Sequence, residues 1–463
     1  MKNHFDFIIL GGGSAGYAAA RTAADLGKRV AIIDGSHILG GLCILRGCMP
    51  SKALIYAAEV LYTAREAQKF GVKVPEAEAN IQAIQENKQR VIAEFQKYRE
   101  EQLHSPKYTL FRYQGRFIDE NTVELNDSQS TQLTADKFLI ATGSKIKRHA
   151  FANLDTIPYL TSDDILELET APKSIVVLGG GFIACELAQF LNRIGVQVTI
   201  IQRSPHLLTN IPEDASRVLE DVFKESGITV YTHTELENIE LVDNEVSVIF
   251  KHNGKAVNCR AEKVFNALGR SPNTQNLGLE NIGVHLRKTG HIETNDYQQT
   301  TNPSIYAAGD CASRIEIVHV AILQGECAAK HAFTGTAEPI NYNDLVQIIF
   351  TDPQIAIAGI LESDLIKRGA NYLTASYPFD DHGKSILMKA KWGYVKIFAD
   401  AITGKILGAE CVGKDASELI HSIAVGITLN ATVFDLLKTH WYHPTLSEIW
   451  AYPLEEIAEQ IKK

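Results

Sequence analysis

The sequence predicts an α/β protein with two Rossmann-like dinucleotide-binding domains and a C-terminal α+β domain. A pattern of strand, glycine-rich turn, helix and strand occurs twice, with a constant offset of 168 residues from Gly11 to Gly179 and from Gly27 to Gly195. The 463 residues suffice for about three domains of roughly 150 residues each. After residue 341 the chain becomes rich in β-type segments as far as residue 413, and then helical.

The first unit opens with an apolar run at residues 5–10 and ends with a second apolar strand, residues 30–33, followed by Asp34. Its turn carries the glycines Gly11, Gly13 and Gly16. Such glycines permit a tight turn, close approach of a pyrophosphate and packing of the helix on the strand, and the helix amino terminus supplies N–H groups to the phosphates. Asp34 stands where a carboxylate accepts hydrogen bonds from a ribose, so we expect a dinucleotide here.

The second unit repeats the turn with Gly179 and Gly181, but it differs at the position that selects the nucleotide. Gln202 occupies the place of Asp34, and Arg203 follows it. Without a carboxylate nothing repels a 2′-phosphate, and an arginine is able to bind one. Alternatively, Arg203 is a solvated surface charge. The sequence therefore modestly favours NADPH over NADH.

Between the units we expect helical segments and a small meander. The helices are predicted at residues 51–70 and about 77–103, and the meander at residues 108–125. A strand at residues 138–140 ends in Ala-Thr-Gly, and a parallel ending occurs at residues 267–269. The expected domains are residues 1–150 and 271–340, which together form the first nucleotide domain, 151–270, and 341–463.

Cys43 and Cys48 lie just after the first crossover, close to the expected dinucleotide. Pro50 suits the first turn of a helix, so Cys48 should stand at a helix amino terminus, which stabilises a thiolate. Gly47 gives the loop the freedom to close a short disulfide. The alternative is a pair of buried free thiols. The other five cysteines are scattered and are expected to be structural: Cys185, Cys259, Cys311, Cys327 and Cys411.

The segment from Cys43 to Lys52 resembles the active-site signature of the pyridine nucleotide-disulfide oxidoreductases. Further signatures of that family occur in the same order at residues 179–186, 306–310 and 443–448, so the resemblance covers essentially the whole chain. It implies FAD in the first unit, NAD(P)H in the second, and a C-terminal domain that mediates dimerisation. Hydride from NAD(P)H would reach the flavin, which would reduce a Cys43–Cys48 disulfide.

The same resemblance implies roles for single residues. Asp310 would bind ribityl and phosphate oxygens of the flavin cofactor, and Lys52 and Glu186 would form an ion pair beside the flavin ring. A cation there favours electron-rich reduced flavin. Phe182 replaces a more usual tyrosine over the ring. Further expected backbone contacts with the cofactors are Gly115, Gly143 and Gly269.

His443 and Glu448 complete the expected site. An imidazole is able to take a proton from an incoming thiol and to return one, while a carboxylate orients its other nitrogen. Because they lie in the implied dimerisation domain, the resemblance predicts that they serve the cysteine pair of the partner subunit. Otherwise, a His before Pro444 is most often a turn residue.

The resemblance leaves the substrate open. Dihydrolipoamide is the first choice, from residues 50–54 and 443–448, although Trp441 stands where dihydrolipoyl dehydrogenases commonly carry another His. The alternatives are an NADPH-dependent enzyme like glutathione reductase, an enzyme like mercuric reductase, or a flavoprotein redox sensor without a dedicated substrate. Residues 198–204 resemble mercuric reductase, but the absence of cysteine after Cys411 argues against its C-terminal thiol pair.

Composition excludes several other classes. The formal net charge is −10 and no basic block occurs, so we expect no nucleic-acid partner. No apolar stretch is long enough for a membrane span, and the first residues do not form a signal peptide. Seven cysteines without a leader indicate a cytoplasmic protein with reduced thiols. We expect no resident metal.

Overall fold

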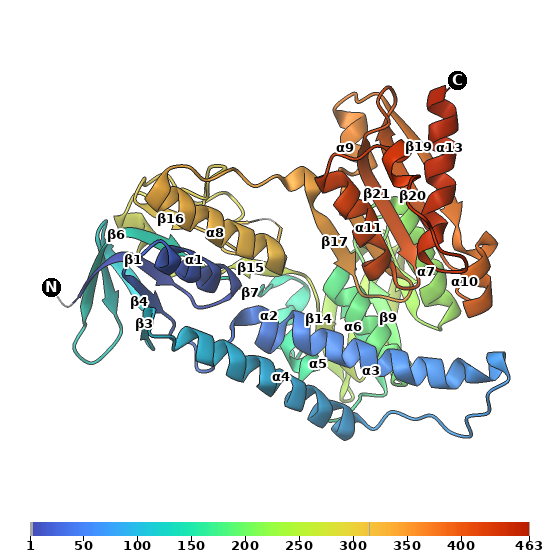
Figure 1. The fold of residues 1–463 in the computed structure, drawn as a ribbon. Helices are drawn as coiled ribbons and strands as arrows, with labels where there is room; N and C mark the ends of the chain where they lie inside the picture. Colours follow the sequence, from blue (N-terminus) through green and yellow to red (C-terminus); the bar gives the residue numbers. More distant parts are fainter. Residues whose placement is uncertain (1–2, 314, 463) are drawn as a thin grey trace.

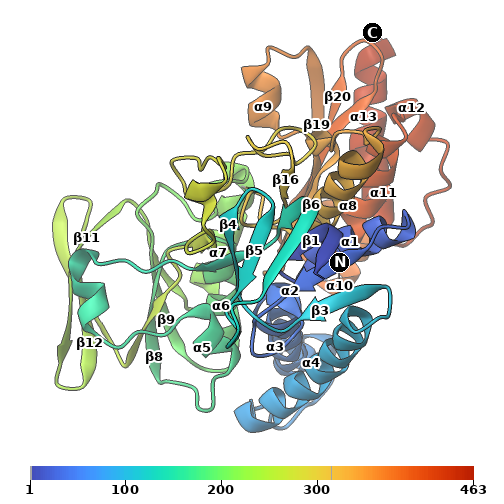
Figure 2. The same cartoon turned by 90° about the vertical axis from the view of Figure 1, so that its left-hand side faces the viewer.

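The computed structural model describes residues 3–313 and 315–462. The strands of the first unit lie at one side of the molecule, the C-terminal domain at the other, and the second β-α-β unit beneath the C-terminal domain (Figure 1). A view from the side separates the second unit clearly from the first sheet (Figure 2). Among the described residues, no helix is long and apolar enough to cross a membrane.

The first sheet has the strand order β3-β2-β1-β6-β5-β4, and β16 also pairs with β6. Its central strand β1 runs parallel to both β2 and β6, so it is buried on both faces. Helices α1 and α8 pack together on one face. These elements are β1 (His4–Leu10), α1 (Ser14–Asp25), β2 (Val30–Ile33), β3 (Tyr108–Phe111), β4 (Gly115–Asp119), β5 (Thr122–Leu125), β6 (Gln132–Ile140), β16 (Ile305–Ala307) and α8 (Val318–Thr334).

The predicted meander at residues 108–125 is only partly correct. Strands β4 and β5 form an antiparallel hairpin that continues onto β6, as expected. Strand β3 instead joins the far edge of the sheet, parallel to β2. A four-residue alternating strand carries no sign of which neighbour it pairs with, because that choice depends on tertiary packing.

The second unit forms a parallel sheet of order β10-β9-β8-β14. A three-stranded antiparallel sheet, β11-β12-β13, packs on it through a shared apolar core that includes Val176, Leu178, Val248 and Phe250. The elements are β8 (Ser174–Leu178), α6 (Phe182–Arg193), β9 (Gln197–Ile201), α7 (Glu213–Glu225), β10 (Thr229–Tyr231), β11 (Thr234–Val242), β12 (Glu245–His252), β13 (Lys255–Ala261) and β14 (Lys263–Asn266).

Helix α3 connects the units. Its buried residues Leu54, Ala58 and Leu61 belong to the same apolar cluster as α6 of the second unit and Ile355 of the C-terminal domain. The two predicted helices are confirmed with small changes at their ends. The connecting elements are α2 (Gly41–Arg46), α3 (Cys48–Glu66), η1 (Ala67–Phe70), α4 (Ile81–Leu103), β7 (Ser144–Ile146), η2 (Phe151–Thr156), α5 (Ser162–Leu166), β15 (Arg270–Pro272) and η3 (Leu279–Asn281).

The C-terminal domain is an antiparallel sheet of order β17-β18-β21-β20-β19. Helix α11 packs on β18 and β21, and α13 packs on β19 and β20. The α+β tail is therefore confirmed. Its elements are η4 (Tyr342–Asp344), β17 (Val346–Ile349), β18 (Gln354–Gly359), α9 (Glu362–Lys367), β19 (Tyr372–Pro378), η5 (Phe379–Asp381), α10 (Gly383–Met388), β20 (Tyr394–Asp400), β21 (Ile406–Gly413), α11 (Ala416–Thr428), α12 (Val433–Leu436), η6 (Ser447–Trp450) and α13 (Ala451–Lys462).

We propose domain boundaries near residues 150, 270 and 340. Strand β16 supports this division, because it returns to the first sheet after the whole of the second unit has been completed.

Candidate active site

The turn between β1 and α1 has no room for larger residues at two of its glycines. A Cβ at Gly16 would lie 1.9 Å from the carbonyl oxygen of Gly11, and one at Gly11 would lie 2.3 Å from that of Ala141. Gly13 caps α1 without any side-chain hydrogen bond. The N–H groups of the first turn, which have no partner within the helix, are thus available to a phosphate.

Asp34 lies beside this turn, as predicted. Its Oδ2 accepts a hydrogen bond from the backbone N–H of Gly12 at 2.8 Å, and its Oδ1 accepts from Ser36 N at 2.9 Å. These donors orient the carboxylate at the carboxyl end of β2, where a dinucleotide ribose would lie.

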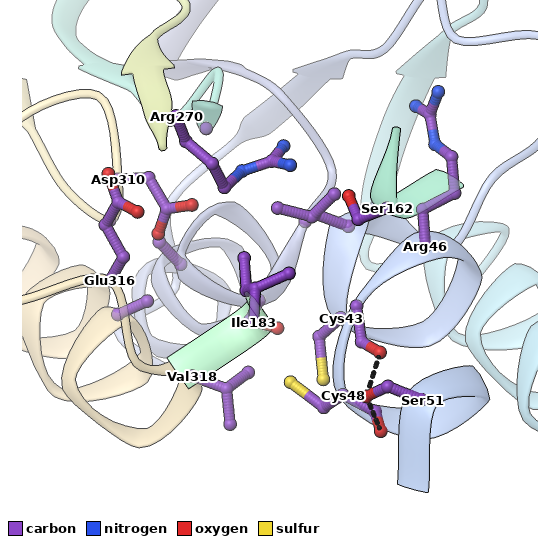
Figure 3. Close-up of a pocket in the computed structure, with 18 of the residues that line it drawn as sticks. Cys43, Arg46, Cys48, Ser51, Ser162, Ile183, Arg270, Asp310, Glu316 and Val318 are labelled. Atoms are coloured by element: carbon purple, nitrogen blue, oxygen red, sulfur yellow. Dashed lines mark hydrogen bonds between the residues drawn. The ribbon is translucent and has the colours of Figure 1, made fainter. Parts of the chain in front are cut away.

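A cavity that opens to solvent runs from this turn to the two cysteines. Its lining residues come from the first dinucleotide-binding unit, from the second unit and from the later segment that returns to the first sheet. Figure 3 shows side chains of these residues around the cavity. The predicted residues on its wall are Gly13, Cys43, Cys48, Lys52, Gly143, Phe182, Glu186 and Asp310. Gly115 is not on this wall and packs under Val123 and Ile33 at the end of β2.

Cys43 and Cys48 lie on consecutive helices. Cys43 belongs to α2, and Cys48 is the first residue of α3, as the sequence predicts. Their sulfurs face one another at the edge of the cavity (Figure 3), and both cysteines are free thiols in the structure. A thiol at a helix amino terminus is favourably placed to ionise.

The two thiols differ in acidity. A hydrogen bond from Cys43 and, against burial, the charge of Lys52 lower the pKa of the Cys48 thiol to about 7. The same hydrogen bond to Cys48, followed by burial, raises the pKa of the Cys43 thiol. Of the two thiols, Cys48, the one beside Lys52, is therefore the first to ionise as the pH rises.

Lys52 and Glu186 form the predicted ion pair, with Nζ 2.8 Å from Oε2. The other carboxylate oxygen, Oε1, accepts a hydrogen bond from the backbone N–H of Phe350 at 2.9 Å. The Glu186 side chain is only 4% exposed, and both its oxygens are satisfied. Lys52 also lies 4.6 Å from the centre of the Phe350 ring. All three domains thus meet at this charge pair.

Asp310 is held from the opposite side of the cavity. Its Oδ2 accepts a hydrogen bond from Ser144 Oγ at 2.7 Å, and Ser144 in turn accepts one from Arg270 Nε at 2.9 Å. Burial and the Asp310 charge raise the pKa of Glu316 to about 7, although Arg270 opposes the rise.

Three residues at this end of the cavity were not predicted from the sequence: Ser144, Arg270 and Glu316. Ser144 directly follows Gly143, and Arg270 directly follows Gly269. The similar sequences at which these two strands end were therefore a usable signal for both residues. No pattern distinguishes Glu316.

Arg99 of α4 is a further residue that the sequence analysis missed. Its guanidinium lies 4.5 Å from the ring centre of Tyr17, and its charge acts on Cys43 by lowering the pKa of that thiol, in opposition to the dominant effects.

The second unit has a similar but less polar turn. A Cβ at Gly179 would lie 2.6 Å from the carbonyl oxygen of Ala267, whereas Gly181 and Gly269 border open space. The Gln202 side chain lies against Gly180, in the same relation as Asp34 to Gly12. Arg203 is exposed. The predicted nucleotide-binding residues are therefore brought together at one edge of this sheet.

His443 and Glu448 are paired but stand apart from the cavity. His443 Nδ1 lies 3.0 Å from both carboxylate oxygens of Glu448. The imidazole is 78% exposed, whereas the carboxylate is 10% exposed. His443 is not among the residues that line the cavity within this chain. Within one chain, the imidazole is therefore exposed at the surface and lies apart from the cavity that holds the cysteines.

Comparison with known proteins identifies the family. Residues 5–325 match the family model described as pyridine nucleotide-disulphide oxidoreductase, and residues 345–453 match the dimerisation domain of the same family. The chain belongs to the pyridine nucleotide-disulphide oxidoreductases. It is therefore a flavoprotein oxidoreductase of a family that uses FAD and NAD(P)H.

Relatives within the family carry two different names. The dihydrolipoyl dehydrogenase of Bacillus subtilis (strain 168) is 32% identical over 460 residues, covering 97% of each chain. A mercuric reductase of Bacillus cereus is also 32% identical, over 96% of this chain and 70% of that enzyme. The crystal structure of LpdA from Mycobacterium tuberculosis superposes with a TM-score of 0.88 at 28% identity, covering 97% of this chain and 99% of that one.

The cavity fits FAD. The glycine turn leaves room for a pyrophosphate, Asp34 is placed for the adenosine ribose, and Asp310 and Lys52 lie farther along the same cavity, toward the cysteines. Within residues 3–313 and 315–462, no group of three or more His, Cys, Asp or Glu is arranged to hold a metal ion.

Proposed function

We propose that this protein is a homodimeric, FAD-dependent disulfide oxidoreductase of the dihydrolipoyl dehydrogenase type, with Cys43 and Cys48 as its redox couple. The observation that carries this proposal is the unequal thiol pair at the wall of the cavity that fits FAD. Support for the finer assignment comes from relatives named dihydrolipoyl dehydrogenase that match this chain over nearly its full length.

Bound FAD would supply the two-electron exchange between the nicotinamide and the cysteine couple. Lys52 places a positive charge at this part of the cavity, and Glu186 offsets the cost of burying it. Phe182 is half-exposed at the cavity wall, where it is able to cover the site until the nicotinamide arrives.

The cysteines would exchange electrons with substrate through a mixed disulfide. In dithiol oxidation, a substrate thiolate attacks Cys43 Sγ, the Cys43–Cys48 bond breaks, and Cys48 leaves as the thiolate. The second thiolate of the same substrate then attacks the substrate sulfur of the mixed disulfide. The bond to Cys43 breaks, the substrate leaves as its disulfide, and Cys43 leaves as the thiolate. Because a sulfur with a low pKa leaves faster, the lowered pKa of Cys48 suits this direction of cleavage.

The partner subunit's His443 would take the proton from each attacking thiol. Glu448 would accept a hydrogen bond from Nδ1, so that Nε2 is the nitrogen that faces the substrate. The Glu448 carboxylate would also stabilise the imidazolium that forms.

Replacement of the exchanging sulfur tests this assignment. We expect Cys43→Ser to abolish turnover of dithiol or disulfide substrates, because no mixed disulfide is able to form, and to leave reduction of bound flavin by NAD(P)H intact. Steady-state and anaerobic single-turnover assays measure the two steps separately. Persistent substrate turnover in this variant would refute the relay.

Substrate and nucleotide choice are tested together. We expect lipoamide to be turned over, and assays with NADH and NADPH against lipoamide, glutathione disulfide and Hg(II) compare the three candidates. The relatives named mercuric reductase make Hg(II) a necessary arm of the experiment. No lipoamide turnover with either nucleotide would exclude the first choice.

The exposed Arg203 is proposed to bind the 2′-phosphate of NADPH. A charge-assisted hydrogen bond is worth roughly 1.5 kcal/mol, so Arg203→Ala should raise the KM for NADPH about tenfold. The KM for NADH serves as the internal control and should stay constant. Equal changes for both nucleotides would show that Arg203 does not discriminate between them.

A further inference from the structure

Glu448 has a second histidine beside it. His382 Nε2 lies 3.4 Å from Glu448 Oε1. The same carboxylate faces His443 Nδ1 with both of its oxygens. His382 is completely buried, in contrast to the exposed His443. No sequence motif marked His382, and the relay proposed above does not use it.

The hydrogen bonds around His382 define which nitrogen carries its proton. Nδ1 lies 2.8 Å from Ser385 Oγ, and Ser385 is also fully buried. If the Ser385 hydroxyl donates to Nδ1, the proton of a neutral imidazole must reside on Nε2, where it faces Glu448. The opposite tautomer would turn a lone pair toward the carboxylate and would be repelled. Nε2 is buried and makes no hydrogen bond of ordinary geometry among the described residues, and Glu448 Oε1, 3.4 Å away, is the acceptor within its reach.

Other groups around His382 are consistent with a neutral ring. Burial lowers the pKa of His382, and His443 adds to this effect while Glu448 opposes it. The Tyr452 ring packs edge-on at 6.3 Å between centres, and Tyr452 itself stacks on Tyr377, whose hydroxyl binds Asp381. The aromatic pair thus fixes the orientation of the imidazole without adding a charge in contact with it.

The same short segment also touches the catalytic imidazole. His382 immediately precedes α10, and a Cβ on the next residue, Gly383, would lie 3.9 Å from His443 Cε1. One turn of chain therefore packs against both members of the His443–Glu448 pair. That placement allows it to set their relative orientation.

We propose that His382 is a positioning residue for this pair: its Nε2–H is directed at Glu448 Oε1 and keeps the carboxylate facing His443 Nδ1. His443 Nε2 then remains free for the substrate proton. This inference rests on the proposed function, in which His443 is the acid–base group.

The kinetic test compares His382→Phe and His382→Gln. Phe keeps the volume and removes the donor, whereas a Gln side chain places an N–H close to the position of Nε2. For dihydrolipoamide oxidation by the holoenzyme we expect kcat to fall about fivefold in His382→Phe, the effect of one lost hydrogen bond of about 1 kcal/mol. In His382→Gln, kcat should stay within about twofold of the original value. Flavin reduction by NADH or NADPH should be unchanged in both variants.

A double-mutant cycle separates positioning from folding. In a Glu448→Ala background, His382→Phe should cause no further loss, because His382 acts only through the carboxylate. Additive losses, equal losses in flavin reduction, or a Gln variant as slow as the Phe variant would each overturn the inference.

A spectroscopic measurement keeps this inference distinct from the proposed function. Nitrogen NMR of the histidine-labelled holoenzyme, with His382→Gln to assign the signal, should show a neutral imidazole protonated on Nε2 at neutral pH. Protonation on Nδ1 alone would overturn the inference. If the unsubstituted enzyme does not oxidise dihydrolipoamide, the proposed function fails, while the NMR result still decides the arrangement of His382.

Discussion

At the scale of single residues, the proposed chemistry depends on the unequal acidity of two neighbouring sulfurs. Cys48 is the more acidic because Cys43 donates a hydrogen bond to it and because Lys52 lies nearby. Because the pKa of Cys48 is lower in the folded protein, its ionisation stabilises the reduced protein. This contribution is complete at a pH above about 8.5, the pKa of an ordinary thiol, and it is lost as the pH falls through about 7.

Removing the donor Cys43 should make the Cys48 thiol less acidic. We expect Cys43→Ala to raise the pKa of Cys48 from about 7 toward the ordinary thiol value, since the hydrogen bond from Cys43 is the largest cause of the lowering. Ultraviolet absorbance of the thiolate during a pH titration of the reduced protein reports the change, and Cys48→Ala provides the baseline. An unchanged titration would mean that Lys52 alone sets the acidity.

The sequence predicted the chemical residues better than the residues that support them. The short spacing of Cys43 and Cys48 and the compact pattern from His443 to Glu448 are local in the chain, so a motif reveals them. His382 and Arg270 contact their partners across many residues of sequence, and only the folded arrangement brings them together.

At the scale of elements, the turn between β1 and α1 determines where a dinucleotide is able to approach. Gly16 is required by the fold itself, because a Cβ there would lie 1.9 Å from the carbonyl oxygen of Gly11. A Cβ at Gly13 would instead enter open space, where Gly41 Cα, 4.0 Å away, would be the atom nearest to it. Two glycines of one motif thus have different physical roles, one in packing and one in keeping the helix amino terminus accessible.

Alanine substitutions separate the two roles. Gly16→Ala should destabilise the flavin-free protein by roughly 3 kcal/mol, because a Cβ would overlap the backbone. Gly13→Ala should leave the stability of the flavin-free protein nearly unchanged and weaken FAD binding. Thermal unfolding without FAD and flavin titration measure the two effects. Equal stability losses in both variants would contradict this division.

Element positions were predictable wherever one helix or strand carried its own pattern. The amino terminus of α3 at Cys48 and the strands around both glycine turns were found in this way. The pairing of β3 was not, because the edge that a short strand joins is decided by its neighbours in space.

At the scale of the whole molecule, the two groups of candidate site residues lie apart within one chain. The cysteines line the cavity, while the exposed His443 lies in the C-terminal domain outside it. That domain also exposes large apolar side chains, which favour burial against a second copy: Leu387, Val425, Leu429 and Tyr442. The match to a dimerisation domain supports a homodimer, in which each complete site would combine two subunits.

The constant offset between the two glycine motifs made the two-unit architecture predictable. The meeting of three domains at Glu186 was not predictable, because Phe350 contributes a backbone N–H that no sequence pattern reveals.

Subunit complementation tests the shared site most directly. Cys43→Ser and His443→Ala chains, each inactive alone, are co-expressed and the mixed dimers are isolated with two affinity tags. One site of each mixed dimer would combine an intact cysteine pair with the partner subunit's His443. We predict about half the wild-type turnover per mixed dimer, since one of two symmetric sites is restored. Mixed dimers as inactive as the parent variants would contradict the account.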